Sequence, residues 1–290
     1  MSKKLDLTDK FTIGYLIVVL FIILFFYSQI PSFIVLSILH VSTIGIIILL
    51  VNTYQKHPQN KILKFFRFWY PPILYTFLYE ETGILNHIIF KTDLDDLFQK
   101  IEYTIFRSQP SIWLYEQFAY VWLNELFHFF YFSYYLLIPV LGLILYFDDL
   151  KKFRHFIFVT SFTFYLCYLI YIFLPVVGPL IWEFPEMKGI IFVPLMNFIY
   201  AYAEKPGAAF PSSHVAVALI VVFFSYRYKR KLFYFFLIDV IFLVIATVYC
   251  RFHYVIDVFA GIITAIGCYY FGNYLYKILM NNTTDGKTPK

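Results

Sequence analysis

The most constraining feature of this sequence is the recurrence of apolar stretches along almost its whole length. Each is about 20 residues long, the length that a helix needs to cross a hydrocarbon core of roughly 30 Å. The stretches lack the strict alternation of apolar and polar residues that marks a membrane β-strand. Because 61% of the 290 residues are apolar and only 14% are charged, the composition excludes a soluble domain. The sequence therefore predicts an all-α, polytopic bundle of membrane helices.

About eight stretches are predicted to be transmembrane helices, and one segment is predicted to be helical along the membrane surface. Segment 84–122 mixes aspartate, lysine and arginine with aromatic and aliphatic residues, which is typical of interfacial helices. The first apolar run is too long for a signal peptide and has no small-residue cleavage site, so we interpret it as the first span. The predicted spans are residues 11–30, 33–52, 66–82, 124–147, 156–175, 210–226, 232–250 and 256–276.

Lysine and arginine are distributed unequally between alternate connections of these helices. The N-terminus, segments 53–67, 148–155 and 227–231, and the C-terminus together hold 17 of the 23 lysines and arginines. Positive residues are retained on the cytoplasmic side of a membrane, so both termini are predicted to be cytoplasmic. The other connections then face the periplasm, the cell exterior or an organelle lumen. The net charge of +5 reflects this topology and does not indicate a nucleic-acid partner.

Two short polar clusters stand at the outer ends of predicted helices. The sequence FPSSHV at 210–215 opens one helix, and CRFHYVIDV at 250–258 joins the end of one helix to the start of another. Two crossings of similar length separate the clusters, so His214 and His253 are expected at the same depth. Ionisable side chains beside hydrocarbon are costly, which favours a functional reason for both clusters.

The residue types in the clusters suit the binding of a phosphate anion. Arg251 offers a bidentate guanidinium and Lys205 a compact positive charge. Ser212 and Ser213 add donors at a helix N-terminus, where the dipole also favours an anion. The alternative for Arg251 and Lys205 is that they anchor their segments at the membrane interface.

The two histidines and one aspartate suit the transfer of a phosphoryl group. A neutral imidazole can attack phosphorus when a carboxylate holds its other nitrogen, and a second, protonated imidazole can protonate the leaving oxygen. Asp257 follows His253 by four residues, so the two share a helix face. The structural alternatives are a helix cap for His214 and an interfacial position for His253.

The two clusters also carry a resemblance to a known family. GAAFPSSH followed by CRFHYVIDVFAG resembles the second and third signature motifs of the type 2 phosphatidate phosphatase superfamily of membrane lipid phosphatases and phosphotransferases. The resemblance implies that His253 is the nucleophile, that Asp257 orients it and that His214 is the acid. It further implies that Ser212 and the amide of Ser213 bind phosphate.

The resemblance covers roughly residues 120–276 and departs from the family pattern in the third motif. That motif usually has an arginine six residues before its histidine, where this chain has Thr247, and Arg251 stands only two residues before. The pattern HYVIDV without the early arginine, and the segment NELFHFFYFSYYLLIP at 124–139, resemble the branch that contains the inositol phosphorylceramide and sphingomyelin synthases. Transfer of a phospho-headgroup to a lipid hydroxyl is therefore an alternative to hydrolysis.

Further polar residues lie near the outer ends of predicted helices. Hydrogen bonding between helices is the commoner reason for such residues, and recognition of a lipid headgroup is the alternative. Glu125 and His128 are the strongest candidates for headgroup recognition. Asp239 lies in the middle of a span, where a bond to a neighbouring helix is expected more than a proton relay. The remaining residues of this kind are Glu80, Glu81, His87 and Asn124.

The sequence thus predicts a membrane enzyme that hydrolyses a lipid phosphate or diphosphate through a phosphohistidine. Residues 1–65 are expected to form two accessory helices and a basic loop, residues 66–276 the catalytic bundle, and residues 277–290 a disordered tail. No His, Asp, Glu or Cys spacing suggests a metal or another cofactor. A lipid transporter or scramblase would carry charges through the depth of the bilayer, whereas here they collect at one face.

Overall fold

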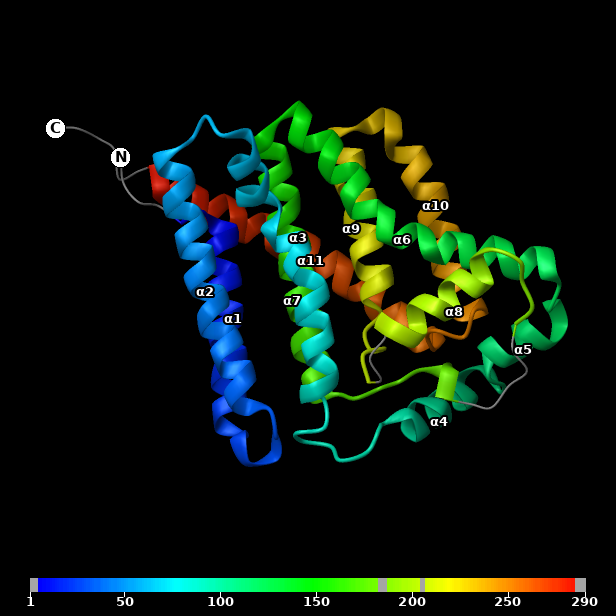
Figure 1. Cartoon of the computed structure of the whole chain (residues 1–290). Helices are drawn as coiled ribbons and strands as arrows, with labels where there is room; N and C mark the ends of the chain where they lie inside the picture. The colour runs from blue at the N-terminus through cyan, green and yellow to red at the C-terminus, as the bar shows by residue number, and fades with distance from the viewer. Residues whose placement is uncertain (1–4, 182–186, 204–206, 285–290) are drawn as a thin grey trace.

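The computed structural model describes residues 5–181, 187–203 and 207–284, and it is almost entirely helical within these ranges. The β-type pairing in the described residues is a single bridge between Val176 and Ala208. These observations confirm the predicted all-α fold. Figure 1 shows the helices, which are α1 (Leu7–Phe25), α2 (Phe33–Lys56), α3 (Lys61–Leu85), α4 (Asp95–Phe106), α5 (Pro110–Phe118), α6 (Val121–Asp148), α7 (Leu150–Phe173), α8 (Phe192–Ala203), α9 (Ser213–Tyr228), α10 (Arg230–Tyr249) and α11 (Val255–Thr284).

A helix occupies each of the eight predicted spans, with ends shifted by several residues. In the described part of the chain, five helices are long and apolar enough to cross a membrane, namely α1, α2, α6, α7 and α11. The apolar parts of α9 and α10 are shorter, and α3 is not among the five. Helix α11 continues to Thr284, so the domain boundary expected after residue 276 lies inside a helix.

Three short helices lie across the end of the bundle where α9 begins (Figure 1). Two of them, α4 and α5, occupy the segment 84–122 that was expected to be helical along the surface. The third, α8, was not predicted, because its 12 residues are too few to span a bilayer and fall in a region interpreted as a loop.

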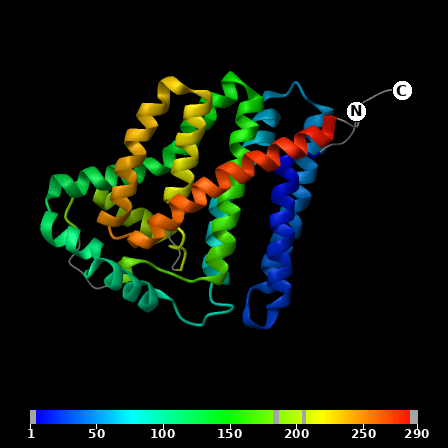
Figure 2. The same ribbon diagram turned by 180° about the vertical axis from the view of Figure 1, so that it is seen from behind.

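The long helices pack around α7 and α9. Helix α9 contacts α7, α10 and α11, and α6 contacts α7 and α10. Helices α1, α2 and α3 pack on the other side of α7, and α11 runs obliquely across the back of the bundle (Figure 2). Most of the buried apolar side chains of these helices form one continuous core.

The two ends of the bundle differ in charge. The α2–α3, α6–α7 and α9–α10 turns, which contain the basic segments of the sequence, lie together at one end (Figure 1). The start of α9 and the α10–α11 connection lie at the other end. The two polar clusters are therefore grouped at the end of the bundle opposite the basic turns.

Candidate active site

The start of α9 is fixed by hydrogen bonds that hold Ser212 and Ser213 in place. Ser212 is the N-cap of α9, and its Oγ accepts from the amide of Val215 at 3.3 Å. The amide of Ser213 donates to the hydroxyl oxygen of Tyr171 at 3.1 Å. Ser212 and Ser213 are both buried, and His214 follows in the first turn with 8% of its surface exposed.

The connection between α10 and α11 is a tight turn that presents His253. The amides of Phe252 and His253 both donate to the carbonyl oxygen of Thr247 at 3.0 Å. Arg251 has a φ of 64°, in the left-handed region that reverses the chain after a helix. His253 then lies immediately before α11, with 3% of its surface exposed.

Asp257 connects the two clusters through its backbone, while its side chain contacts residues of its own cluster. Its Oδ2 accepts from the amide of Tyr254 at 2.8 Å, and its carbonyl oxygen accepts from the amide of Ser212 at 3.0 Å. A glycine at position 261 permits this approach, because a Cβ there would lie 2.6 Å from the carbonyl oxygen of Ser212. Helices α9 and α11 can therefore start side by side.

The three predicted catalytic side chains form one continuous series. Nδ1 of His253 lies 3.5 Å from Oδ2 of Asp257, and Nε2 of His253 lies 3.4 Å from Nδ1 of His214. The hydroxyl of Tyr131 lies 3.1 Å from Nε2 of His214 and 2.7 Å from the hydroxyl of Tyr200. Two histidines that face each other, one with a carboxylate 3.5 Å from its far nitrogen and the other with a hydroxyl group 3.1 Å away, are an arrangement that suits nucleophilic and acid–base catalysis.

Of the two cations that the sequence predicts as phosphate ligands, the structure describes Arg251. The guanidinium of Arg251 lies 4.8 Å from the ring centroid of Tyr115 on α5, and Arg251 is 8% exposed. It is thus held at the same turn as His253, with an aromatic ring against its charge. Lys205, the other predicted cation, lies outside the described residues.

Glu125 makes the contacts of a helix cap. Its carboxylate accepts from the amides of Ile190, Ile191, Phe192 and Val193 at 2.6 to 3.3 Å. These amides belong to the start of α8, where an acidic side chain satisfies donors that have no partner within the helix.

The other polar residues of the outer ends also contact neighbouring elements. Nδ1 of His128 lies 2.7 Å from the carbonyl oxygen of Asn124, and the side chain of Asn124 accepts from the hydroxyl of Tyr249 at 2.7 Å. Asp239 accepts from the hydroxyl of Ser133 at 3.0 Å, which is the bond between helices expected for it. Earlier in the chain, Glu81 pairs with His40 at 2.7 Å, and His87 with Asp93 at 3.1 Å.

Two buried carboxylates of α4, which the sequence did not single out, bind the connection between α10 and α11. Oδ1 of Asp95 accepts from the hydroxyl of Tyr254 and the amide of Gly178, both at 2.9 Å. Oε1 of Glu102 accepts from the amides of Val255 and Ile256 at 2.5 and 3.3 Å, at the start of α11. Burial raises the pKa of Asp95 above its usual range and the pKa of Glu102 to about 7.

A pocket of about 320 Å³ opens beside His214. Its wall is apolar and aromatic, and Ser213 and His214 form part of its lining. Such a pocket suits a hydrocarbon or another apolar group. Within residues 5–181, 187–203 and 207–284, no group of three or more His, Cys, Asp or Glu side chains is arranged to hold a metal ion.

Comparison with known proteins adds one match. A family model described as the PAP2 superfamily matches residues 112–271, which is more than half of the chain. No curated protein and no solved structure matches. The matched region contains His214, His253 and Asp257, whereas α3 and α4 precede it.

Proposed function

The chain belongs to the PAP2 superfamily, and on that premise we propose that it is a membrane enzyme that hydrolyses a lipid phosphate or diphosphate through a phosphohistidine. The observation that carries the proposal is the buried series of Asp257, His253 and His214. Each histidine has one nitrogen toward the other and one toward a positioning group. This arrangement supplies a nucleophile and an acid at one point.

In the first step, Nε2 of His253 attacks phosphorus while the bond from phosphorus to the leaving oxygen breaks. Asp257 accepts from Nδ1–H of His253, which keeps the lone pair on Nε2 and stabilises the positive charge of the phosphohistidine. His214 donates its proton to the leaving oxygen. For this step His214 must be an imidazolium: its Nε2–H donates to the hydroxyl oxygen of Tyr131, and its Nδ1–H, on the side of His253, is the proton that leaves, so that a neutral imidazole remains.

In the second step, His214 removes a proton from water, and the water oxygen attacks phosphorus. The bond between phosphorus and Nε2 of His253 then breaks, which releases inorganic phosphate and restores both histidines. A general acid–base group of this kind contributes roughly 10² to 10⁴ to the rate. Because the facing nitrogens of the two rings are 3.4 Å apart, the His214 ring must turn aside when a phosphoryl group binds to His253.

Arg251 is proposed to bind the phosphoryl oxygens together with Ser212, Ser213 and Lys205. Its guanidinium is held at the same turn as the nucleophile, and its fork matches two oxygens of a phosphoryl group. Glu125 caps α8 and His128 bonds to the outer end of α6. These contacts favour a structural role for both residues over contact with a headgroup.

We further propose that the site faces the periplasm, the cell exterior or an organelle lumen. The proposal rests on the basic turns, which lie at the opposite end of the bundle and mark the cytoplasmic side. Residues 1–65, which precede the matched region, are proposed to be accessory to the catalytic bundle. The proposed chemistry uses the side chains named above and assigns no role to a metal or another cofactor.

The second candidate function is transfer of the phospho-group to a lipid hydroxyl. It is favoured by the pocket beside His214, which offers an alcohol a place next to the group that would deprotonate it. In this reaction the alcohol oxygen replaces the water oxygen in the second step, and the rest of the chemistry is unchanged.

The test is an assay of purified protein with phosphorus-labelled phosphatidate, polyprenyl diphosphate and phosphatidylinositol, with and without a long-chain alcohol. Hydrolysis predicts labelled inorganic phosphate from at least one of the first two lipids. Transfer predicts a new labelled lipid that appears only with the alcohol. If neither product forms at a rate above that of the His253→Gln variant, the proposal is wrong.

A further inference from the structure

A basic pocket lies at the end of the bundle opposite the catalytic histidines (Figure 1). Its volume is about 570 Å³, and its walls come from the first turns of α7, the last turn of α9 and the C-terminal part of α11. None of the described residues that line it is acidic. Its charged lining residues are five cations, namely Lys151, Lys152, Arg154, Arg227 and Lys277. The pocket therefore attracts an anion.

Two of these cations already have a carboxylate partner. Lys152 pairs with Asp148 at 2.9 Å, and Arg154 pairs with Asp6 at 3.3 Å. The nearby Asp149 caps the first turn of α7 by accepting from a backbone amide. Within residues 5–181, 187–203 and 207–284, the other three cations form no ion pair, and each comes from a different helix. Three positive charges thus surround the pocket without a balancing carboxylate.

His155 adds a buried nitrogen that lacks a partner. It lines the pocket and is 6% exposed. Its Nδ1 lies 2.7 Å from the hydroxyl of Tyr228, whereas its Nε2 is buried and forms no hydrogen bond with the described residues. The side chain of Asn273, which also lines the pocket, instead accepts from Arg227 and donates to the carbonyl oxygen of Tyr269. Because a buried polar atom without a partner is costly, a ligand oxygen at Nε2 would stabilise this arrangement.

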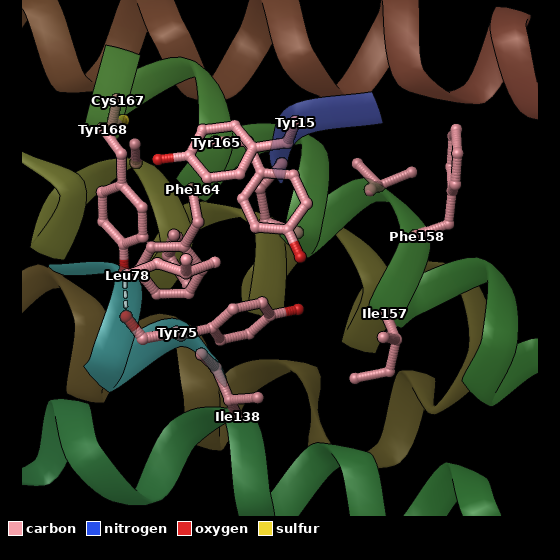
Figure 3. Close-up of a cluster of buried hydrophobic side chains, with 14 of the residues drawn as sticks. Tyr15, Tyr75, Leu78, Ile138, Ile157, Phe158, Phe164, Tyr165, Cys167 and Tyr168 are labelled. Carbon is pink, nitrogen blue, oxygen red and sulfur yellow. Dashed lines mark hydrogen bonds between the residues drawn. The ribbon is translucent and has the colours of Figure 1, made fainter. Parts of the chain in front are cut away.

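The basic pocket is separate from the catalytic site. His155 lies near the start of α7, and Tyr171 lies near its end, where its hydroxyl oxygen accepts from the amide of Ser213. The two α7 residues are 16 positions apart, which corresponds to roughly 24 Å of helix. Figure 3 shows part of the apolar core between them, including Phe158 and Tyr168. A ligand in the basic pocket therefore does not contact the catalytic histidines.

We propose that the basic pocket is a second phosphate site, which binds a phosphomonoester group on the side of the membrane that carries the basic turns. A phosphomonoester has a charge of about −1.5 to −2 and three acceptor oxygens, which suits three cations and one N–H group. When the hydroxyl of Tyr228 donates to Nδ1 of His155, the ring proton is on Nε2, and this N–H donates to a phosphate oxygen. The inference goes beyond the proposed function and does not depend on it.

Membrane topology alone does not account for the pocket. Retention of lysine and arginine on the cytoplasmic side explains why cations gather at this end of the bundle. It does not explain a buried histidine with an unpartnered nitrogen in the same pocket. The phosphomonoester can belong to a lipid or to a soluble compound, and Tyr274 and Met280 in the lining favour a lipid.

The experiment measures the number and the affinity of phosphatidate molecules bound to the full-length protein in detergent by native mass spectrometry. All proteins carry His253→Gln, so that the lipid is not consumed. Lys151→Gln/Lys277→Gln removes two exposed cations of the pocket, and Lys56→Gln/Lys61→Gln removes two exposed lysines beside the α2–α3 turn at the same end of the bundle. We expect the first pair to weaken the binding of one phosphatidate about tenfold, as for a lost hydrogen bond to a charged group. The second pair should change it less than about twofold.

His155→Phe tests the buried nitrogen, because it keeps a ring against Tyr276, on which His155 stacks at 4.1 Å, and loses Nε2. It should also weaken the binding of one phosphatidate about tenfold. If this variant does not fold, the exposed lysine pair still decides the inference. Equal affinities in the two lysine variants, or unchanged binding in a folded His155→Phe protein, would overturn the inference, since binding would then reflect only the overall positive charge.

Two further ligands define the chemistry of the site. Phosphatidylglycerol, whose phosphodiester carries a single charge, should bind more weakly than phosphatidate, and equal affinity would contradict a phosphomonoester site. Inorganic phosphate in excess distinguishes the two sources of the group. Failure to displace the phosphatidate that depends on Lys151 and Lys277 assigns the site to a lipid, and displacement assigns it to a soluble phosphate compound.

Discussion

Nδ1 of His214 lies 3.4 Å from Nε2 of His253, although 39 residues separate the two in the sequence. The contact exists because α9 and α10 cross the bundle in opposite directions and return the chain to the same end. Asp257 completes the arrangement from the first turn of α11, behind His253. The site therefore depends on the lengths of two helices and on the turn that ends the second.

Arg251 can be tested by a substitution that keeps its charge. Arg251→Lys loses the planar fork, so kcat/KM with a lipid phosphate should fall by roughly 10 to 100 fold, as expected for one or two hydrogen bonds to a charged group. Arg107→Lys is a close control, because Arg107 also has a left-handed backbone, with a φ of 57°, at the end of α4. Wild-type kinetics in Arg251→Lys would show that Arg251 only anchors the turn.

Glu125→Ala should lower stability more than it changes catalysis. The variant leaves the amides at the start of α8 without their acceptor, so the free energy of unfolding in detergent should fall by about 1 to 2 kcal/mol. Glu125→Gln keeps an acceptor oxygen and should lose less. A large increase in KM at unchanged stability would instead assign Glu125 to headgroup recognition.

The pKa of Glu102 predicts how stability varies with pH. Its folded-state value of about 7 lies above the usual 4.5, so the contribution of this group to stability is present in full below about pH 4.5 and is lost as the pH rises through about 7. Glu102→Gln keeps an acceptor for Val255 and Ile256 but does not titrate. The melting temperature of the variant should therefore exceed that of the wild type at pH 8, and the difference should shrink at pH 5. An equal difference at both pH values would contradict the raised pKa.

The orientation of the site can be tested by thiol labelling. Cys167, Cys250 and Cys268 are all buried, so the background reaction should be low. Ile190→Cys, at a position that is 78% exposed at the end where the site lies, should react with an impermeant thiol reagent in intact cells. Lys231→Cys, in the first turn of α10 next to the basic connection from α9, should react only after the membrane is opened. The reverse pattern would place the site in the cytoplasm.

The proximity of the two histidines and Asp257 could be predicted from the sequence because their positions follow from helix length. His214 and His253 flank two crossings of similar length, and Asp257 is one helical turn beyond His253. Tyr131 could not be predicted in the same way. It is one of several aromatic residues on α6, and only the rotation of α6 against α9 decides which of them contacts His214.

The role of α4 could not be predicted either. Glu102 and Asp95 occur in a mixed segment where an acidic residue suits a solvated surface, and their burial depends on how α4 packs on the connection between α10 and α11. From the sequence alone Glu125 is a candidate for headgroup recognition, because the sequence pattern does not predict α8, the helix that it caps. Its function as a cap follows only from the position of that helix in the structure.

The measurement that tests the account most directly is the trapping of the phosphoenzyme on a single histidine. In His214→Ala, a phosphorus-labelled nitrophenyl ester needs no proton on its leaving group, so the first step should proceed and the second should be slow. We predict that an acid-labile, base-stable label accumulates in this variant and that mass spectrometry places it on His253. His253→Gln should take up no label and turn over no substrate. Label on any residue other than His253, or full turnover in either variant, would contradict the assignment of His253 as nucleophile and His214 as acid.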